Sequence, residues 1–216
     1  MNSTIDEASY QQYFDALIAG NRTQCKQTLT KLVAAGTDLK DLYVNLFQRA
    51  LYQVGELWEN QRVSVAVEHL ATAITTRLMS ELHALTFSGQ TRDRSIVIAC
   101  VADEYHQLGG RMIADFCEMR GWHGHFLGTN TPLPDLLEAI EEHRPSLLGL
   151  SLSIYLNLPV LLDAIAAVTA RFPELPILVG GQALRWGSLD DVLAYPQVRC
   201  VNTLDELELA LAAYEQ

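Results

Sequence analysis

A histidine and a nearby carboxylate follow an apolar run at residues 95–101, in the segment DEYHQLG of residues 103–109. The imidazole of His106 is of a type that ligates transition metals. A ligating imidazole needs an acceptor at its second ring nitrogen, and Glu104 is placed to supply one. Gly109 would let the backbone pass close to a bulky ligand. By themselves, these residues fit either a metal ligand or a solvated surface histidine.

A second group of residues that could bind a ligand lies earlier in the chain, where nine residues separate Trp58 from the pair Glu68 and His69. Tryptophan offers a flat apolar wall, glutamate accepts hydrogen bonds from hydroxyl groups, and neutral imidazole binds metals. The alternative is an ordinary core tryptophan and an exposed pair in the first turn of a helix, where Glu68 favours the helix dipole. Trp58 ends one expected helix, and Glu68 and His69 lie in the first turn of the next.

The first 88 residues are predicted to be entirely helical, because they contain no proline and their apolar residues follow helical spacing. Four helices with short links indicate a small bundle. Gly36 is a natural stop for the second helix, and Thr37-Asp38 and Ser64 are natural starts for the third and fourth. The expected helices cover 6–19, 22–35, 37–58 and the region from 64 onward.

After a polar segment the pattern changes to short apolar runs that alternate with helical stretches. Such alternation indicates a doubly wound parallel sheet with helices on both faces. Ligands of such sheets bind beyond the carboxyl ends of the strands, which include the loops after residues 101 and 152. The predicted organisation is a helical bundle at 1–88, a linker at 89–94 and an α/β domain at 95–216. The expected strands are 95–101, 123–127, 146–152, 176–179 and 198–201, and the expected helices are 109–120, 133–143, 158–171, 188–194 and 204–214.

The strand-end residues resemble the motifs of the cobalamin-binding domain family, which carries D-x-H-x-x-G, S-x-L and G-G. Here these motifs read Glu104 to Gly109, then Ser151 to Ser153, then Gly180-Gly181, with intervals of 41 and 26 residues. The resemblance covers essentially the whole chain, because a four-helix bundle commonly precedes the sheet and caps the corrin in this family. It implies a flavodoxin-like (Rossmann-type) sheet of five parallel strands.

The resemblance also implies roles for single residues. His106 would be the lower axial cobalt ligand, displacing the cofactor's own base, and Glu104 would be its partner. The displaced nucleotide tail would run between the Ser151 loop and Gly180-Gly181, where small residues leave room. Two positions depart from the family pattern: glutamate replaces aspartate at 104, with an arm still long enough to reach the imidazole, and Ser153 replaces the usual leucine.

The spacing Trp-x9-Glu-His is similar to the cap of the adenosylcobalamin photoreceptors of the CarH type. That resemblance implies that Trp58 packs against the adenosyl group, that Glu68 hydrogen-bonds it, and that His69 becomes the upper ligand after photolysis. It implies a sensor that holds adenosylcobalamin between the cap and the α/β domain, loses the adenosyl group in light, and signals by a conformational or oligomeric change.

Composition and charge constrain the partners. The net charge of −11, from 15 basic and 26 acidic residues without a basic run, argues against direct nucleic-acid binding. The bundle begins within about ten residues of Met1, so we expect no DNA-binding domain before it and a protein partner, such as a transcription regulator or a second copy of the chain. We also expect no membrane span. Four cysteines without a C-x-x-C spacing and a polar N-terminus indicate a cytoplasmic protein, with Cys100 and Cys200 as buried thiols.

Two other classes stay open. One is a corrinoid carrier subunit of a methyltransferase system, which shares the sheet motifs and a helical cap; the spacing Trp-x9-Glu-His argues against it. The other is a sensor that binds heme or a bilin in the same pocket, because His106 also suits heme iron. Apart from the corrinoid carrier, we expect no enzymatic activity.

Overall fold

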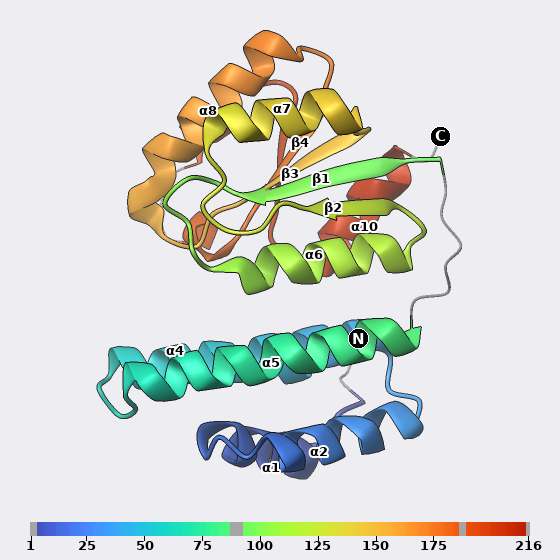
Figure 1. Ribbon diagram of the computed structural model, residues 1–216, viewed down its shortest axis with the longest axis vertical. Coiled ribbons are helices and arrows are strands. Elements are labelled where there is room, and N and C mark those ends of the chain that lie inside the picture. The colour runs from blue at the N-terminus through green and yellow to red at the C-terminus, as the bar shows by residue number, and fades with distance from the viewer. Residues whose placement is uncertain (1–3, 87–92, 186–188, 215–216) are drawn as a thin grey trace. The chain divides into compact units, whose positions relative to one another are not determined.

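The computed structural model describes residues 4–86, 93–185 and 189–214. The chain divides into two compact units, Met1–Thr86 and Phe87–Gln216. In Figure 1 the first unit is drawn as helices alone and the second as strands and helices. Of the linker expected at 89–94, only residues 93 and 94 lie within the described part of the chain.

The helices of the first unit begin and end close to their expected positions. The Asp6 carboxylate caps α1 by accepting a hydrogen bond of 2.8 Å from the Ser9 N–H, and the Asn21 side chain caps α2. Gly36 follows α2 with a φ of +79°, a left-handed conformation that favours glycine. The bounds of the helices are α1 Glu7–Ile18, α2 Arg22–Ala34, α3 Leu39–Asp41, α4 Arg49–Glu59 and α5 Val65–Thr86.

The expected helix at 37–58 differs from the structure in one respect. It begins after the Asp38 cap, but between α3 and α4 the segment Leu42–Gln48 is π-helical. Four large side chains within six residues of this segment are buried: Leu42, Tyr43, Leu46 and Phe47. In the wider π turn, residues four and five apart lie on the same face, so all four side chains pack into the bundle. The spacing of these four residues is also compatible with an α-helix, so the sequence pattern does not indicate the π turn.

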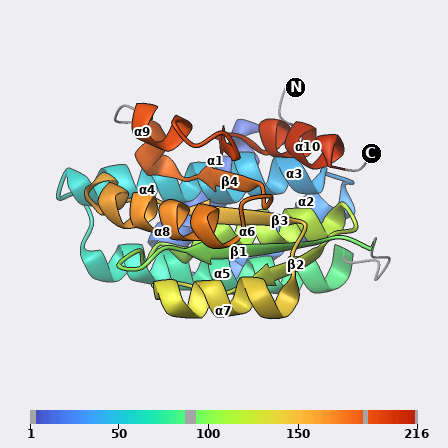
Figure 2. The same cartoon turned by 90° about the horizontal axis from the view of Figure 1, so that it is seen from above.

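The second unit contains a five-stranded sheet in the order β2-β1-β3-β4-β5, with every pairing parallel (Figure 2). This confirms the predicted doubly wound, flavodoxin-like fold. The strands are β1 Ser95–Cys100, β2 His123–Phe126, β3 Leu147–Ser151, β4 Ile177–Gly180 and β5 Val198–Val201. The helices are α6 Gln107–Met119, α7 Leu133–His143, α8 Leu158–Arg171, α9 Asp190–Leu193 and α10 Leu204–Ala213, with short 3-10 turns at Tyr155–Asn157 and Gln182–Arg185 that the sequence did not predict.

Alternate residues of β1 face opposite sides of the sheet, so both faces carry an apolar core. Val97 and Ala99 pack with residues of α7, α8 and α9, whereas Ile96 and Ile98 pack with residues of α6 and α10. Figure 1 shows α6 and α10 on one face and α7 and α8 on the other. Each fully buried aliphatic side chain contributes roughly 1.5–3 kcal/mol, which holds the strand ends in fixed positions.

The chain changes direction at β1. The connection from β1 to β2 runs through α6 on one face, and later connections run through α7, α8 and α9 on the other. The loops that leave β1 and β3 therefore turn to opposite faces and leave a crevice beyond the carboxyl ends of these two neighbouring strands. This crevice is the expected ligand position in such a sheet, and the loops on either side of it carry His106 and Ser153.

Within the described residues, no helix has the length and apolar character needed to cross a bilayer. The longest helix, α5, has 22 residues but carries Glu68, Arg77 and Glu81 along its length.

Candidate functional site

The turn after β1 buries an acid and exposes a histidine. The Glu104 side chain has no exposed surface, whereas 61% of the His106 side chain is exposed. The Glu104 Oε1 atom lies 2.6 Å from His106 Nδ1 and accepts a second hydrogen bond, of 2.9 Å, from the His106 backbone N–H. The longer arm of glutamate therefore does reach the imidazole, although the family pattern has aspartate at this position.

The second oxygen of Glu104 binds the loop after β3. Glu104 Oε2 accepts hydrogen bonds of 2.7 Å from the Ser153 N–H and of 3.0 Å from the Ile154 N–H. Burial raises the pKa of the Glu104 carboxyl, but the hydrogen bonds from His106, Ser153 and Ile154 outweigh burial and lower this pKa to about 2. One buried, ionised carboxylate thus joins the two loops that border the crevice.

The ionised Glu104 also selects the state of the His106 ring. A carboxylate only accepts hydrogen bonds, so Nδ1 of the neutral ring must carry the proton and Nε2 must carry the lone pair. His106 is the residue directly before α6, so its ring lies at the amino end of that helix. The arrangement prepares Nε2 to coordinate a metal.

Two asparagines that the sequence analysis did not identify hold the same turn. Asn130, in the loop between β2 and α7, accepts a hydrogen bond of 2.8 Å from the Asp103 N–H through Oδ1. Asn157, before α8, donates one of 2.9 Å from Nδ2 to the Asp103 carbonyl oxygen. The side chain of Asp103 itself is exposed. No spacing rule identifies these asparagines, because their partners are backbone atoms of a distant loop.

Ser151 and the glycine pair meet across neighbouring strands. Ser151 ends β3 and pairs in register with Cys100 of β1 and Gly180 of β4. At Gly181 φ is +121°, and a Cβ there would lie 2.0 Å from the Leu152 carbonyl oxygen. The need for glycine at 181 is therefore explained by a close approach of the chain to itself. The room that we expected these glycines to leave for a nucleotide tail stays a prediction.

Exposed apolar side chains lie on the two loops that Glu104 joins, and the sequence did not indicate them as a group. Tyr105 is 65% exposed and Leu156 is 86% exposed, and Ile154 and Tyr155 are exposed as well. Gly109, in the first turn of α6, has no atom within 4 Å of the position of a Cβ. In the sequence, these residues were indicated only by the continuous apolar run 154–156 shortly after a strand, because a loop normally carries polar residues. We call Tyr105, Ile154, Tyr155 and Leu156 the apolar rim.

The cysteine next to the site is inert. Cys100 is buried, and its Sγ lies 3.7 Å from the His106 carbonyl oxygen. Burial, followed by the charge of Glu104, raises the pKa of this thiol to about 11. The predicted buried thiol is confirmed for Cys100 but is wrong for Cys200, which is only partly buried because β5 is an edge strand.

The group predicted on the bundle lies at one end of the first unit. Trp58 is the penultimate residue of α4 and is 47% exposed, and a turn at 60–64 leads into α5. Glu68 accepts a hydrogen bond of 2.9 Å from Thr72 Oγ1, and the His69 Nε2 atom lies 3.6 Å from Glu68 Oε2. The His69 side chain is largely exposed. A half-exposed indole near the end of α4 and a carboxylate and an exposed imidazole near the start of α5 therefore lie on either side of this turn.

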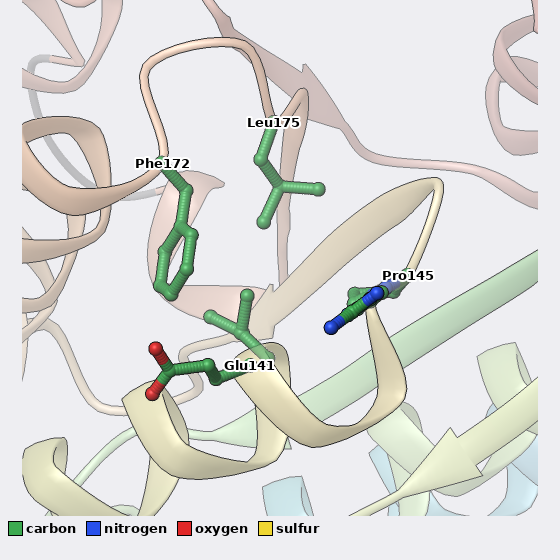
Figure 3. A pocket seen from close by; sticks show the side chains of 6 residues that line it. Glu141, Pro145, Phe172 and Leu175 are labelled. Atoms are coloured by element: carbon green, nitrogen blue, oxygen red, sulfur yellow. The ribbon is translucent and has the colours of Figure 1, made fainter.

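A shallow pocket of about 250 Å³ lies elsewhere on the second unit. It is at the opposite edge of the sheet from His106, where α7 and α8 end and β3 and β4 begin (Figure 3). The Glu141 carboxylate beside it pairs with Arg171. No residue predicted for the site belongs to this pocket, which is lined by Ile140, Glu141, Arg144, Pro145, Phe172 and Leu175.

The second unit presents an imidazole at the switch point of a doubly wound sheet, where proteins of this class bind their ligands, and neutral imidazole is a common metal ligand. Comparison with known proteins gives the family. Residues 10–83 and residues 94–192 each match a sequence model described as a B12 binding domain. The chain belongs to the B12-binding domain family, and it is a cobalamin-binding protein.

Two curated relatives come from Myxococcus xanthus. The HTH-type transcriptional repressor CarH is 31% identical over 169 residues, which cover 77% of this chain and 55% of CarH. The HTH-type transcriptional repressor CarA is 28% identical over 129 residues, which cover 57% of this chain and 43% of CarA. The chain therefore spans about half the length of the curated relatives that it matches.

Among solved structures, the monomethylamine corrinoid protein of Methanosarcina barkeri superimposes with a TM-score of 0.82. The alignment covers 98% of this chain and 99% of that protein at 14% sequence identity. At this identity the similarity shows a shared fold.

Proposed function

We propose that this chain binds adenosylcobalamin and acts as a light sensor that passes its signal to a protein partner. When bound, adenosylcobalamin supplies a cobalt–carbon bond that light cleaves. The residues of the chain bind the cofactor on both faces and respond to the loss of the adenosyl group. The similarity to CarH, together with the group at the turn between α4 and α5, carries this proposal.

The surface around His106 fits a corrinoid. A corrin ring is broad and largely apolar, and the apolar rim offers exposed side chains on which it can lie. His106 Nε2 is the lower cobalt ligand in this proposal, and the hydrogen bond from Nδ1 to Glu104 fixes the ring. The open space at Gly109 leaves room for the ring close to the backbone. Ser151, Ser153, Gly180 and Gly181 would hold the nucleotide tail.

The upper face of the cofactor is assigned to the bundle. Trp58 presents a half-exposed indole to the adenosyl group, and Glu68 accepts hydrogen bonds from its ribose hydroxyls. His69 would offer its imidazole to the same face once the adenosyl group is lost. The contacts of the bundle would differ before and after loss of the adenosyl group. Light would therefore shift the populations of two conformations, and this shift is the proposed signal.

The output is proposed to be non-enzymatic. The CarH relative is a transcriptional repressor, which supports a regulatory role. The net charge of −11 favours a protein partner over direct contact with nucleic acid. The partner is a transcription regulator or a second copy of this chain, in which case light changes the oligomeric state.

An absorption spectrum of the purified protein with adenosylcobalamin, recorded in the dark and after green light, tests the sensor. We expect a light-dependent spectral change together with a change in hydrodynamic size or partner binding. Unchanged size and unchanged partner binding after complete photolysis would leave a cobalamin-binding protein without a sensory role.

A corrinoid carrier is the second candidate, because the shared fold with a monomethylamine corrinoid protein favours it. Affinities for adenosylcobalamin, methylcobalamin and hydroxocobalamin in the dark separate the two. A preference for methylcobalamin would support the carrier. Heme and bilin serve as control ligands in the same titration, and the match to B12 binding domains predicts weak binding of both.

A further inference from the structure

Two residues with left-handed backbone conformations face each other beside the histidine turn. Asp103 has a φ of +62° and Asn130 has a φ of +48°. This region is uncommon for residues other than glycine, although asparagine and aspartate adopt it more readily than most. Such residues persist where the surrounding structure holds them, and they concentrate at ligand sites.

Asn130 holds the turn at two consecutive residues. Its Oδ1 accepts a hydrogen bond of 2.8 Å from the Asp103 N–H, and its own N–H donates one of 2.8 Å to the Glu104 carbonyl oxygen. The loop between β2 and α7 is anchored next to this point, because the Thr131 N–H donates to the Cys100 carbonyl oxygen at 3.0 Å. The position of Asn130 is therefore tied to the end of β1.

Asn130 completes a set of hydrogen bonds that join the loop after β1 to two other loops. Asn157, from the loop after β3, binds the Asp103 carbonyl oxygen, and the Glu104 carboxylate binds the N–H groups of Ser153 and Ile154. The loop after β2 adds the hydrogen bonds of Asn130. The backbone that carries the Glu104 side chain is thus held by the loops of both strands that flank β1.

We infer that Asn130 is a positioning residue for the cobalt ligand. Asn130 fixes the backbone of residues 103 and 104, the fixed backbone aims the Glu104 carboxylate, and the carboxylate holds the Nδ1–H form of His106. Without the Oδ1 acceptor, the Asp103 N–H loses its partner and the turn relaxes. His106 then competes less well with the cofactor's own base. The inference rests on the proposed role of His106 as the lower ligand.

Three substitutions separate the effect of the Asn130 side chain from the effect of the backbone strain at this residue. Asn130→Asp keeps both an acceptor at the same place and a residue that tolerates positive φ. Asn130→Gly relieves the strain but removes the acceptor, and Asn130→Ala removes the acceptor and keeps the strain. Asn21→Ala, which removes the cap of α2 in the other unit, is the matched control for a general loss of stability.

The first readout is made on the cofactor-free protein, where the ¹⁵N chemical shifts of the His106 ring report its tautomer. We expect the Nδ1–H form to dominate in the wild type and in Asn130→Asp, and to lose that dominance in Asn130→Ala and Asn130→Gly. The second readout is the affinity for adenosylcobalamin and the fraction with His106 on cobalt. We expect a loss of about tenfold in Asn130→Ala and Asn130→Gly, the size of one lost hydrogen bond.

The outcomes distinguish this inference from the proposed function. Wild-type behaviour of Asn130→Gly would show that only backbone strain matters and would overturn the inference. So would an unchanged tautomer and affinity in Asn130→Ala while His106→Ala loses the histidine-ligated spectrum. If His106→Ala keeps that spectrum, the proposed ligand is wrong, and the tautomer measurement still decides whether Asn130 controls the imidazole.

Discussion

Glu104 and His106 stand two residues apart and share a hydrogen bond of 2.6 Å, yet the carboxylate is fully buried and most of the imidazole is exposed. This contrast gives the two residues different duties. The acid is fixed by four hydrogen bonds within the protein, and the histidine presents its ring at the surface. Substitutions of the two residues should therefore have different effects on stability and on binding.

His106→Ala should remove the histidine-ligated spectrum of bound cobalamin and lower stability by only about 1 kcal/mol, because the exposed ring gives up one of the four hydrogen bonds to the buried Glu104 carboxylate. Absorption spectra and a denaturant titration measure the two effects. His123→Ala, at an exposed histidine on β2, is the matched control and should bind cobalamin as the wild type does. An unchanged spectrum in His106→Ala would remove this residue from the site.

Glu104→Gln should lower both the stability of the protein and its affinity for cobalamin. The amide presents an NH2 group where the carboxylate accepts N–H donors, so at least one buried group loses its partner at a cost of roughly 1–3 kcal/mol. The affinity for cobalamin should fall about 10- to 100-fold, as is typical when the partner of a metal-bound histidine is lost. Isothermal titration and denaturant unfolding measure these losses. Wild-type affinity in a folded Glu104→Gln would contradict the role of Glu104.

The loss of stability at low pH should also depend on Glu104. The pKa of Glu104 is about 2 in the folded protein, against an ordinary value of 4.5, so its stabilising contribution is complete above the ordinary value and is lost as the pH falls towards 2. The difference between the two pKa values corresponds to at most about 3 kcal/mol. Between pH 5 and pH 2, the wild type should lose stability more steeply than Glu104→Gln. The exposed Glu138→Gln should retain the steep wild-type profile.

Glu68→Ala should reduce the preference for adenosylcobalamin over methylcobalamin by about tenfold, because one hydrogen bond to the adenosyl group is lost. Parallel titrations with the two cofactors in the dark measure the ratio. Glu59→Ala, at an exposed residue at the same end of the bundle, is the control. Equal losses for both cofactors would show that Glu68 does not recognise the adenosyl group.

His69→Ala should photolyse at the wild-type rate but fail to form a product with histidine on both faces of cobalt. The change in hydrodynamic size or partner binding should be lost with it. Spectra and size-exclusion chromatography before and after green light measure both effects. His83→Ala provides the control on the same helix, because 14 residues place it about 21 Å along the axis from His69. A wild-type product in His69→Ala would assign the upper position to another ligand.

The strands and helices of the second unit were largely predictable. Apolar runs such as 95–101 and the helical spacing of 133–143 and 158–171 are strong local signals, and the structure has elements at those places. The π-helical segment Leu42–Gln48 was not predictable, because its buried residues Leu42, Tyr43, Leu46 and Phe47 fit the spacing of an ordinary α-helix as well. A local pattern does not contain that information.

For the site, the sequence indicated the pair Glu104 and His106 because the two residues are close in the chain. It did not indicate Asn130 and Asn157, whose bonds to Asp103 span 27 and 54 residues. Hydrogen bonds from a side chain to a distant backbone leave no spacing that can be recognised. Likewise, the steric reason for Gly181 became visible only once the Leu152 carbonyl oxygen was placed beside it.

The four hydrogen bonds to Glu104 all come from groups of the protein, and this affects the thermodynamics of binding. The loops after β1 and β3 have already lost their conformational entropy on folding, so the entropic cost of ordering them on ligand binding is small. Binding through such a preorganised surface should show a small entropic penalty, and the contribution of these loops to the heat capacity change should be set by the apolar area of the rim. A light-dependent change in heat capacity would then report on rearrangement outside these two loops.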